Sequence, residues 1–216
     1  MVSRGQYLER PTLIPLEGGL VLEGVAHRGD KTPGLLVLPP PPMQGSGMDD
    51  VVAAELAFAA SRAGHPTLRF NYRGVGASQG TVARDPEAWL EDAMAALELA
   101  SDNAHGAGAV VASIGASDAV ALELAKRRTV AGLVLVSPSV LGPGDFAQLS
   151  WPLGVVLPEL DSTDAVLSWR AAAQRLDVQV TVVPGATRVY ARNLPVVGKA
   201  VAALLARASL PRARTD

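Results

Sequence analysis

Apolar residues along this chain gather in short runs that alternate with longer amphipathic segments. The runs are rich in Val, Leu and Ile, which is typical of strands covered on both faces. The longer segments carry apolar residues at helical spacing and begin near Asp, Ser or Pro. We expect strands at 20–26, 35–38, 66–71, 108–112, 130–136, 154–157 and 178–183, and helices at 48–63, 85–100, 116–127, 162–175 and 194–206.

Strands that alternate with helices of this length predict an α/β fold, in which a mostly parallel sheet has helices on both faces. We expect one domain over residues 1–216, with 1–19 as an N-terminal extension and 208–216 as a disordered tail. The first strand, 20–26, is expected to be antiparallel. Because sites in such sheets form at the carboxyl ends of the strands, candidate residues are sought in the loops that follow them.

Composition narrows the classes of function. Of the 216 residues, 49% are apolar and 19% charged, which predicts a globular chain. The net charge of −2 argues against nucleic acid or an anionic membrane as a partner. The absence of cysteine excludes disulfides and thiolate chemistry. The first 20 residues lack the apolar core of a signal peptide, and no apolar run reaches about 18 residues, so we expect a cytoplasmic protein. We also expect no metal and no cofactor.

Ser113 is the candidate nucleophile. Segment 109–116 (Ala-Val-Val-Ala-Ser-Ile-Gly-Ala) is predicted to form a buried strand, a sharp turn at the serine and the start of a helix. That order is typical of a nucleophile elbow, although a serine there could also cap the helix. An acid and then a histidine should follow, but His27, His65 and His105 all precede it.

A second serine fits the motif's letters better. Residues 76–80 (Gly-Ala-Ser-Gln-Gly) are a literal Gly-x-Ser-x-Gly. However, Ser78 lies seven residues past Asn71 and well before the next helix, whereas an elbow joins a strand directly to a helix. We therefore interpret this segment as a glycine-rich loop that packs beneath the site.

Segment 68–80 (Leu-Arg-Phe-Asn-Tyr-Arg-Gly-Val-Gly-Ala-Ser-Gln-Gly) resembles the strand-and-loop signature of small α/β-hydrolases, of the dienelactone-hydrolase-like or short serine esterase type. The resemblance extends over about residues 20–206 and implies an α/β-hydrolase fold with little or no cap. Members of this family carry a His-Pro-His-Pro loop followed by Gly-Gly and Met. The matching segment, 39–48, has prolines at both histidine positions.

The same resemblance places the other members of a catalytic triad. Segment 183–190 (Val-Pro-Gly-Ala-Thr-Arg-Val-Tyr) is similar to the family's Pro-Gly-Ala-Asp-His-Phe-Phe turn, with Arg188 in the position of the catalytic histidine. Asp161 follows a strand where the family has its triad carboxylate. Asp161 could instead cap a helix or be a solvated loop acid, and Glu159 and Asp164 lie close enough to compete for the role.

Arg188 cannot act as a general base, because a guanidinium stays protonated in proteins. It could form a charge-assisted bridge to Asp161 across the vacant site, or it could face solvent. Tyr190 and Lys199 are the other conceivable bases after Ser113, and Lys199 lies on the predicted closing helix. Metal binding is not expected, because no His-Glu-x-x-His spacing occurs.

An oxyanion hole would take one backbone N–H after the nucleophile, which is that of Ile114, and one from the loop after the third strand. That loop begins with four prolines, which have no N–H, so its first donors are Met43 and Gln44. The alternative is a rigid surface loop. Segment 138–152 is the only room for a lid, and it could equally be an ordinary loop that packs Phe146 and Trp151.

These features favour a pseudoenzyme: an α/β-hydrolase-like protein with a degenerate triad, in which Ser113 and Asp161 are relics. In that reading, Gln44, Arg188 and Tyr190 would bind a carboxylate or another anion, or the protein would bind a protein partner. The rival hypothesis is an active serine esterase or acyl hydrolase that uses Ser113 with an unconventional base. A third reading, an interaction module, depends on exposed apolar surface.

Overall fold

In the computed structural model, residues 8–210 are described, and within them the chain forms one eight-stranded sheet of order β1-β2-β4-β3-β5-β6-β7-β8. Strand β2 pairs antiparallel with β1 and β4, and the remaining neighbours are parallel. The strands are β1 (Arg10–Pro15), β2 (Val21–His27), β3 (Gly34–Leu38), β4 (Thr67–Phe70), β5 (Ala109–Ile114), β6 (Gly132–Val136), β7 (Leu153–Pro158) and β8 (Val178–Val183).

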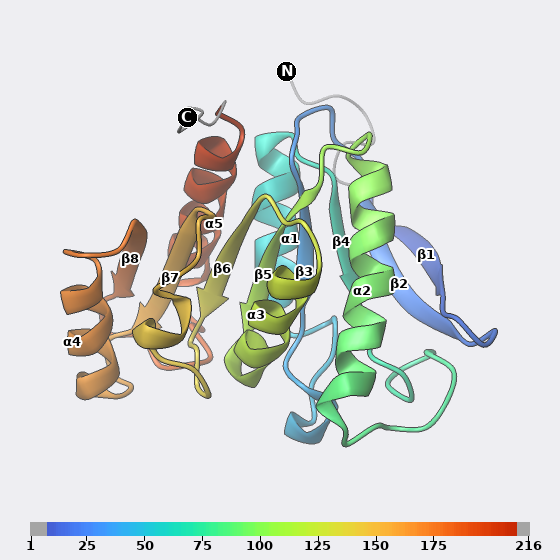
Figure 1. The fold of residues 1–216 in the computed structure, drawn as a ribbon, viewed down its shortest axis with the longest axis horizontal. Helices are drawn as coiled ribbons and strands as arrows, with labels where there is room; N and C mark the ends of the chain where they lie inside the picture. The colour runs from blue at the N-terminus through green and yellow to red at the C-terminus, as the bar shows by residue number, and fades with distance from the viewer. Residues whose placement is uncertain (1–7, 211–216) are drawn as a thin grey trace.

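Helices cover both faces of the sheet (Figure 1), so the expected α/β fold class is confirmed. In that view α2 and α3 lie in front of the strands, and α1 and α5 lie behind them. The helices are α1 (Val51–Ala63), α2 (Pro86–Asn103), α3 (Asp118–Arg127), α4 (Thr163–Ala172) and α5 (Leu194–Ala208), with short 3₁₀ turns η1 (Pro42–Gln44), η2 (Gly115–Ser117) and η3 (Pro143–Phe146).

Two apolar layers hold the helices to the sheet. One packs α2, α3 and α4 against one face and includes Phe70 and Trp169; the other packs α1 and α5 against the opposite face and includes Tyr190 and Leu204. Successive residues of a strand point to opposite faces, so strand β5 contributes Val111 to the first layer and its neighbours to the second. Burial on both faces explains why the central strands are uninterrupted apolar runs.

The ends of the chain differ from the prediction. Strand β1 lies inside the segment expected to be an N-terminal extension. It was missed because Pro11 and Pro15 argue against a strand, yet both are tolerated on β1, which is an edge strand. At the other end, α5 extends to Ala208, and the rest of the predicted tail beyond residue 210 lies outside the described residues.

The segment considered as a lid packs against the body of the protein. Within 138–152, Phe146 is buried and its ring centroid lies 5.9 Å from that of Trp169 on α4. Trp151 is half-buried against the same apolar layer. These contacts match the ordinary-loop interpretation, and the fold has at most a minimal cap.

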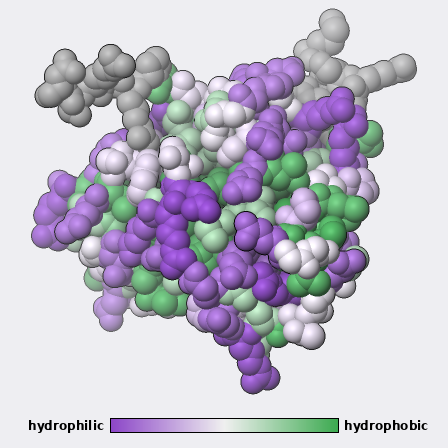
Figure 2. Space-filling view, turned by 45° about the vertical axis from the view of Figure 1, so that its right-hand side comes forward, coloured by the Kyte–Doolittle hydropathy of each residue, from purple (hydrophilic) through white to green (hydrophobic). Residues whose placement is uncertain are grey.

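The outer surface bears on the interaction-module reading. On the face shown in Figure 2, hydrophobic residues form scattered patches between bands of hydrophilic ones.

No helix between residues 8 and 210 is long and apolar enough to cross a membrane, and no three His, Asp or Glu side chains in that range are grouped to hold a metal ion.

Candidate functional site

The candidate site lies at the carboxyl edge of the sheet, at the lower end of the strands in Figure 1. The parallel strands all end there, and the segments that follow them carry Met43, Gln44, Asp161, Arg188 and Tyr190, whereas Ser113 and Ile114 lie inside β5.

Ser113 is inside strand β5 and not at its end. Its register partners are Leu38 of β3 and Leu135 of β6, and its exposed fraction is 1%. Its hydroxyl has no hydrogen-bond partner among the described residues, and it does not cap α3. The prediction of a sharp turn at Ser113 is therefore wrong, because the strand continues through Ile114.

The sharp turn falls at Gly115. Its φ is +59°, in the left-handed region that side chains rarely adopt, and η2 and α3 follow it directly. A nucleophile elbow places its catalytic residue on such a strained strand-to-helix turn, flanked at two residues' distance by small residues. Here the flanking positions are Ser113 and Ser117, and the turn residue itself has no side chain.

Ser117 shows why small residues flank the turn. It is fully buried, and its hydroxyl donates to the carbonyl of Pro39 at 2.5 Å, which joins the start of the helix to the end of β3. The sequence interpretation placed the elbow's nucleophile at Ser113, two residues before the turn. A pattern of small residue, x, Gly, x, small residue across 113–117 is the signal that could have corrected it.

The predicted oxyanion donors belong to two elements, β5 and η1. Ile114 is buried within β5. Because the turn residue is Gly115, the N–H that follows it in the chain is that of Ala116. Met43 and Gln44 lie in η1, where the N–H of Gln44 already donates to the carbonyl of Pro41 at 2.9 Å. The side chain of Gln44 is closer to the turn: its Oε1 lies 3.3 Å from the point where a Cβ on Gly115 would stand.

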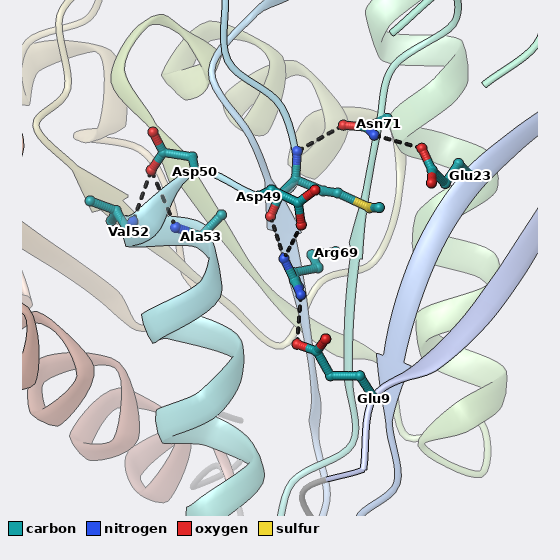
Figure 3. A network of polar contacts seen from close by, with 9 residues as sticks. Glu9, Glu23, Asp49, Asp50, Val52, Ala53, Arg69 and Asn71 are labelled. Atoms are coloured by element: carbon teal, nitrogen blue, oxygen red, sulfur yellow. Dashed lines mark hydrogen bonds and ion pairs between the residues drawn. The ribbon is translucent and has the colours of Figure 1, made fainter. Parts of the chain in front are cut away.

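A polar network fixes the loop that carries Met43 and Gln44 (Figure 3). Asn71 Oδ1 accepts from the N–H of Met48 at 2.8 Å, and Arg69 Nη1 donates to the carbonyl of Met48 at 2.7 Å. Both side chains come from β4 and the residue that follows it, so the loop is held to the sheet from both sides of Met48. Arg69 also pairs with Asp49 and Glu9, at 2.9 and 2.6 Å.

Ser78 belongs to the same support. It is buried, its hydroxyl donates to the carbonyl of Asn71 at 2.7 Å, and it accepts from the N–H of Glu23 at 2.9 Å. Glu23 in turn accepts from Asn71 Nδ2. The glycine-rich loop therefore packs beneath the site, as predicted, and its serine is fully engaged in structure.

Asp161 and Arg188 form the ion pair that the sequence allowed. Arg188 Nε donates to Oδ2 of Asp161 at 2.8 Å, and Nη2 lies 2.8 Å from the same oxygen. The Asp161 carboxylate, as its hydrogen-bond partner, raises the pKa of the Arg188 guanidinium further. About half of the arginine side chain remains exposed, and Ser162, not Asp161, caps α4. The neighbouring Glu159 accepts from the N–H of Gly185 at 2.8 Å.

Tyr190 does not face a ligand site. Its exposed fraction is 0%, and its hydroxyl lies 2.8 Å from Ser137 Oγ and donates to the carbonyl of Val156 at 3.3 Å. Burial raises the pKa of this phenol. The phenol is enclosed and hydrogen-bonded, and Asp161 pairs with Arg188, so this geometry does not favour the anion site predicted on Arg188 and Tyr190, which stays a prediction. Lys199 lies apart from both, in a groove between α1 and α5.

Asp118 is a structural residue that the sequence analysis missed. It starts α3, is fully buried, and its Oδ2 accepts from the N–H groups of Ser139, Val140 and Leu141 at 2.8, 2.9 and 3.1 Å. Its Oδ1 accepts from the N–H of Ala119. This single carboxylate fixes the loop after β6 beside the turn at Gly115; only the folded structure reveals it, because its partners are backbone groups some 20 residues away.

An apolar pocket of about 350 Å³ opens beside that turn. It is bounded by η1, by the start of α2 and by α3, and the loop that Asp118 holds closes one side. Its main walls are Met43, Gln44, Trp89, Leu90, Val120 and Val140.

The histidines lie elsewhere in the fold. His27 and His65 are buried at the amino edge of the sheet, where His27 Nδ1 lies 2.8 Å from Thr67 Oγ1 and His65 Nδ1 lies 2.7 Å from the carbonyl of Pro33. His105 occupies an exposed turn after α2. None of them lies near the turn at Gly115.

The fold and this site geometry define an α/β-hydrolase-fold protein. Its structural neighbours include an α/β serine hydrolase homologue from Coxiella burnetii, with 25% identity, a TM-score of 0.75, and coverage of 91% of this chain and 97% of that one. A serine hydrolase without a lid from Xanthomonas campestris has 20% identity and a TM-score of 0.74, over 95% and 97% of the two chains.

A third neighbour, Est1E from Butyrivibrio proteoclasticus with bound ferulic acid, has 15% identity and a TM-score of 0.75, over 91% and 98% of the two chains. No protein-family model matches the sequence, and no curated protein matches it. The likeness therefore rests on the three-dimensional fold, across almost the full length of each neighbour.

Proposed function

We propose that this protein is a non-hydrolytic member of the α/β-hydrolase fold that binds a small molecule at the carboxyl edge of its sheet. The observation that carries the proposal is the glycine at the strand-to-helix turn. Gly115 occupies the strained position from which an elbow presents its nucleophile, and a residue without a side chain has nothing to attack a carbonyl.

The surrounding residues support the same function. Ser113 points into the core and not into the site, and Arg188 is a protonated guanidinium paired with the carboxylate that would otherwise orient a histidine. No histidine follows residue 105 in the sequence. A general base and a nucleophile are thus both missing, whereas the pocket beside the turn remains open.

The test begins with a fluorophosphonate probe and p-nitrophenyl acetate on the wild-type protein. We expect no labelling, and no turnover above that of the Ser113→Ala variant. Stoichiometric labelling that disappears in Ser113→Ala would overturn the proposal and establish the rival function, an active serine esterase.

The Gly115→Ser variant, alone and combined with Arg188→His, tests whether the loss lies at the turn. A Cβ on Gly115 meets only the end of the flexible Gln44 side chain, so a serine fits there, at a strain cost of about 1–3 kcal/mol. We expect slow fluorophosphonate labelling of Gly115→Ser, and faster labelling of the double variant. If neither variant is labelled while both remain folded, the loss of hydrolysis is not located at Gly115.

A further inference from the structure

The charged side chains at the pocket beside Gly115 determine which ligand charge it can accept. Its side-chain walls include two carboxylates, Glu87 and Glu123, and no lysine, arginine or histidine. Both carboxylates are bound by Arg127, which lies outside the pocket: Nη1 contacts Glu87 at 2.5 Å, and Nε contacts Glu123 at 2.9 Å. Glu123 also lies 3.5 Å from Lys126 Nζ, so both carboxylates are paired with cations outside the pocket, and the lining itself offers an anionic ligand no cation to bind.

The remaining wall is apolar, apart from the side chain of Gln44. The indole N–H of Trp89 donates to the carbonyl of Ala83, so its ring presents only apolar surface. Gln44 differs from it: among residues 8–210 its carboxamide has no hydrogen-bond partner, and it points over Gly115. A carboxamide both donates and accepts hydrogen bonds, which suits an amide or alcohol group.

We propose that this pocket binds an uncharged amphiphile, with an apolar chain or ring between α2 and α3 and a neutral amide or hydroxyl group at Gln44. The volume of about 350 Å³ is within the range of small-ligand sites. This inference rests on the proposed function and names the ligand class of that same site: neutral, and not the anion expected from the sequence.

The experiment compares two ligands of equal chain length, octanamide and octanoate, at pH 8. Each displaces the neutral fluorophore N-phenyl-1-naphthylamine, excited by energy transfer from tryptophan. We expect octanamide to displace the fluorophore at a concentration at least tenfold lower than octanoate does. The Glu87→Gln and Glu123→Gln variants should reduce the ratio of the octanoate to the octanamide concentration needed for displacement. The Gln44→Leu variant should bind octanamide more weakly but bind the fluorophore as well as the wild-type protein does.

A matched pair of variants locates the binding. Ala119→Leu fills the pocket from α3 and should weaken the fluorophore at least fivefold, whereas Ala202→Leu fills the separate groove between α1 and α5 and should leave binding unchanged. Near-ultraviolet circular dichroism checks that both variants keep their packing.

Three outcomes would overturn the inference: octanoate that binds as well as octanamide, equal effects of the two leucine variants, or no binding of the fluorophore. Ester turnover is measured separately. Hydrolysis by the wild-type protein together with a preference for octanamide would refute the non-hydrolytic function and leave the ligand class standing. If the wild-type protein does not hydrolyse the ester and shows no preference for octanamide, the ligand class is refuted and the non-hydrolytic function stands.

Discussion

The two serines on either side of Gly115 occupy equivalent positions but have opposite energetic roles. The hydroxyl of Ser117 satisfies the carbonyl of Pro39, whereas the hydroxyl of Ser113 is buried without a partner among residues 8–210. A buried hydroxyl that makes no hydrogen bond costs about 1–3 kcal/mol of desolvation. The fold therefore tolerates Ser113 as a small residue between β5 and the helices that cover it, and gains nothing from its polarity.

Ser113→Ala is accordingly expected to raise the free energy of unfolding by about 1 kcal/mol, because it removes an unsatisfied polar atom and keeps the Cβ. Ser117→Ala is the matched control, and it should lower stability by about 1–2 kcal/mol by leaving the carbonyl of Pro39 unpaired. Urea denaturation at constant m value measures both. A loss of more than 1 kcal/mol in Ser113→Ala would show that its hydroxyl is hydrogen-bonded after all.

At the scale of elements, the loops of the candidate site are held by polar side chains that reach them from neighbouring elements. Arg69 and Asn71 fix the loop between β3 and α1, and Asp118 fixes the loop after β6. Each of these side chains makes hydrogen bonds to backbone groups of a loop, and the loop's own side chains do not replace those hydrogen bonds. The pocket walls are thereby positioned by residues that do not line the pocket themselves.

Asp118→Asn is expected to destabilise the protein by about 2–3 kcal/mol, because hydrogen bonds to a charged acceptor contribute more than neutral ones. It should also speed hydrogen exchange of residues 139–141, whose amides lose their acceptor. Hydrogen-exchange mass spectrometry of the peptide over 137–150 checks this. Asp145→Asn is the control in the same loop: Asp145 is exposed and accepts only from the N–H of Gly142, so its loss should cost less than about 1 kcal/mol.

Elements with a strong hydrophobic period could be predicted from the sequence, whereas the ends of some of them could not. Strand β8 and the start of α5 were placed correctly, and the fold class followed from the alternation of elements. Strand β5 was ended two residues early, because Ser113 was taken as a turn residue although both its neighbouring strands cover it with leucines.

The same limit applies to the candidate site. The pairing of Arg188 with Asp161 could be anticipated from chain order and charge, and it is present. The burial of Tyr190 could not, because a positive φ of 48° turns its ring inward to Ser137, and no local pattern signals that conformation. The clamp at Asp118 joins backbone groups distant in sequence, which no pattern of side chains reveals.

The whole molecule separates its titratable histidines from its candidate site. His27 and His65 lie at the amino edge of the sheet, and the pocket lies at the carboxyl edge. Burial lowers the pKa of both imidazoles; Glu9 opposes this in part at His27 and the Pro33 carbonyl does so at His65, and Arg69 and Lys31 add smaller lowering effects. These histidines therefore affect stability and not ligand binding.

The sign of the pH dependence follows from that direction. Below the unfolded pKa of about 6.5, the unfolded chain binds protons that the folded chain does not, so the stability contributed by the two neutral histidines is complete above that pH and is lost as the pH falls through their lowered folded values. Each histidine can change the free energy of unfolding by at most about 1.4 kcal/mol per pH unit. We expect stability to fall between pH 7 and pH 5.5, and octanamide binding to stay constant.

The double variant His27→Asn and His65→Asn should flatten that slope, because an asparagine amide can replace the Nδ1 hydrogen bond of each imidazole and does not titrate in this range. His105→Asn removes an exposed imidazole from a turn whose positive φ asparagine tolerates, and it serves as the control. Urea denaturation at intervals of half a pH unit gives the slopes. If the slope of unfolding free energy against pH is unchanged in the double variant, the loss of stability at low pH is due to carboxylates and not to the histidines at the amino edge of the sheet.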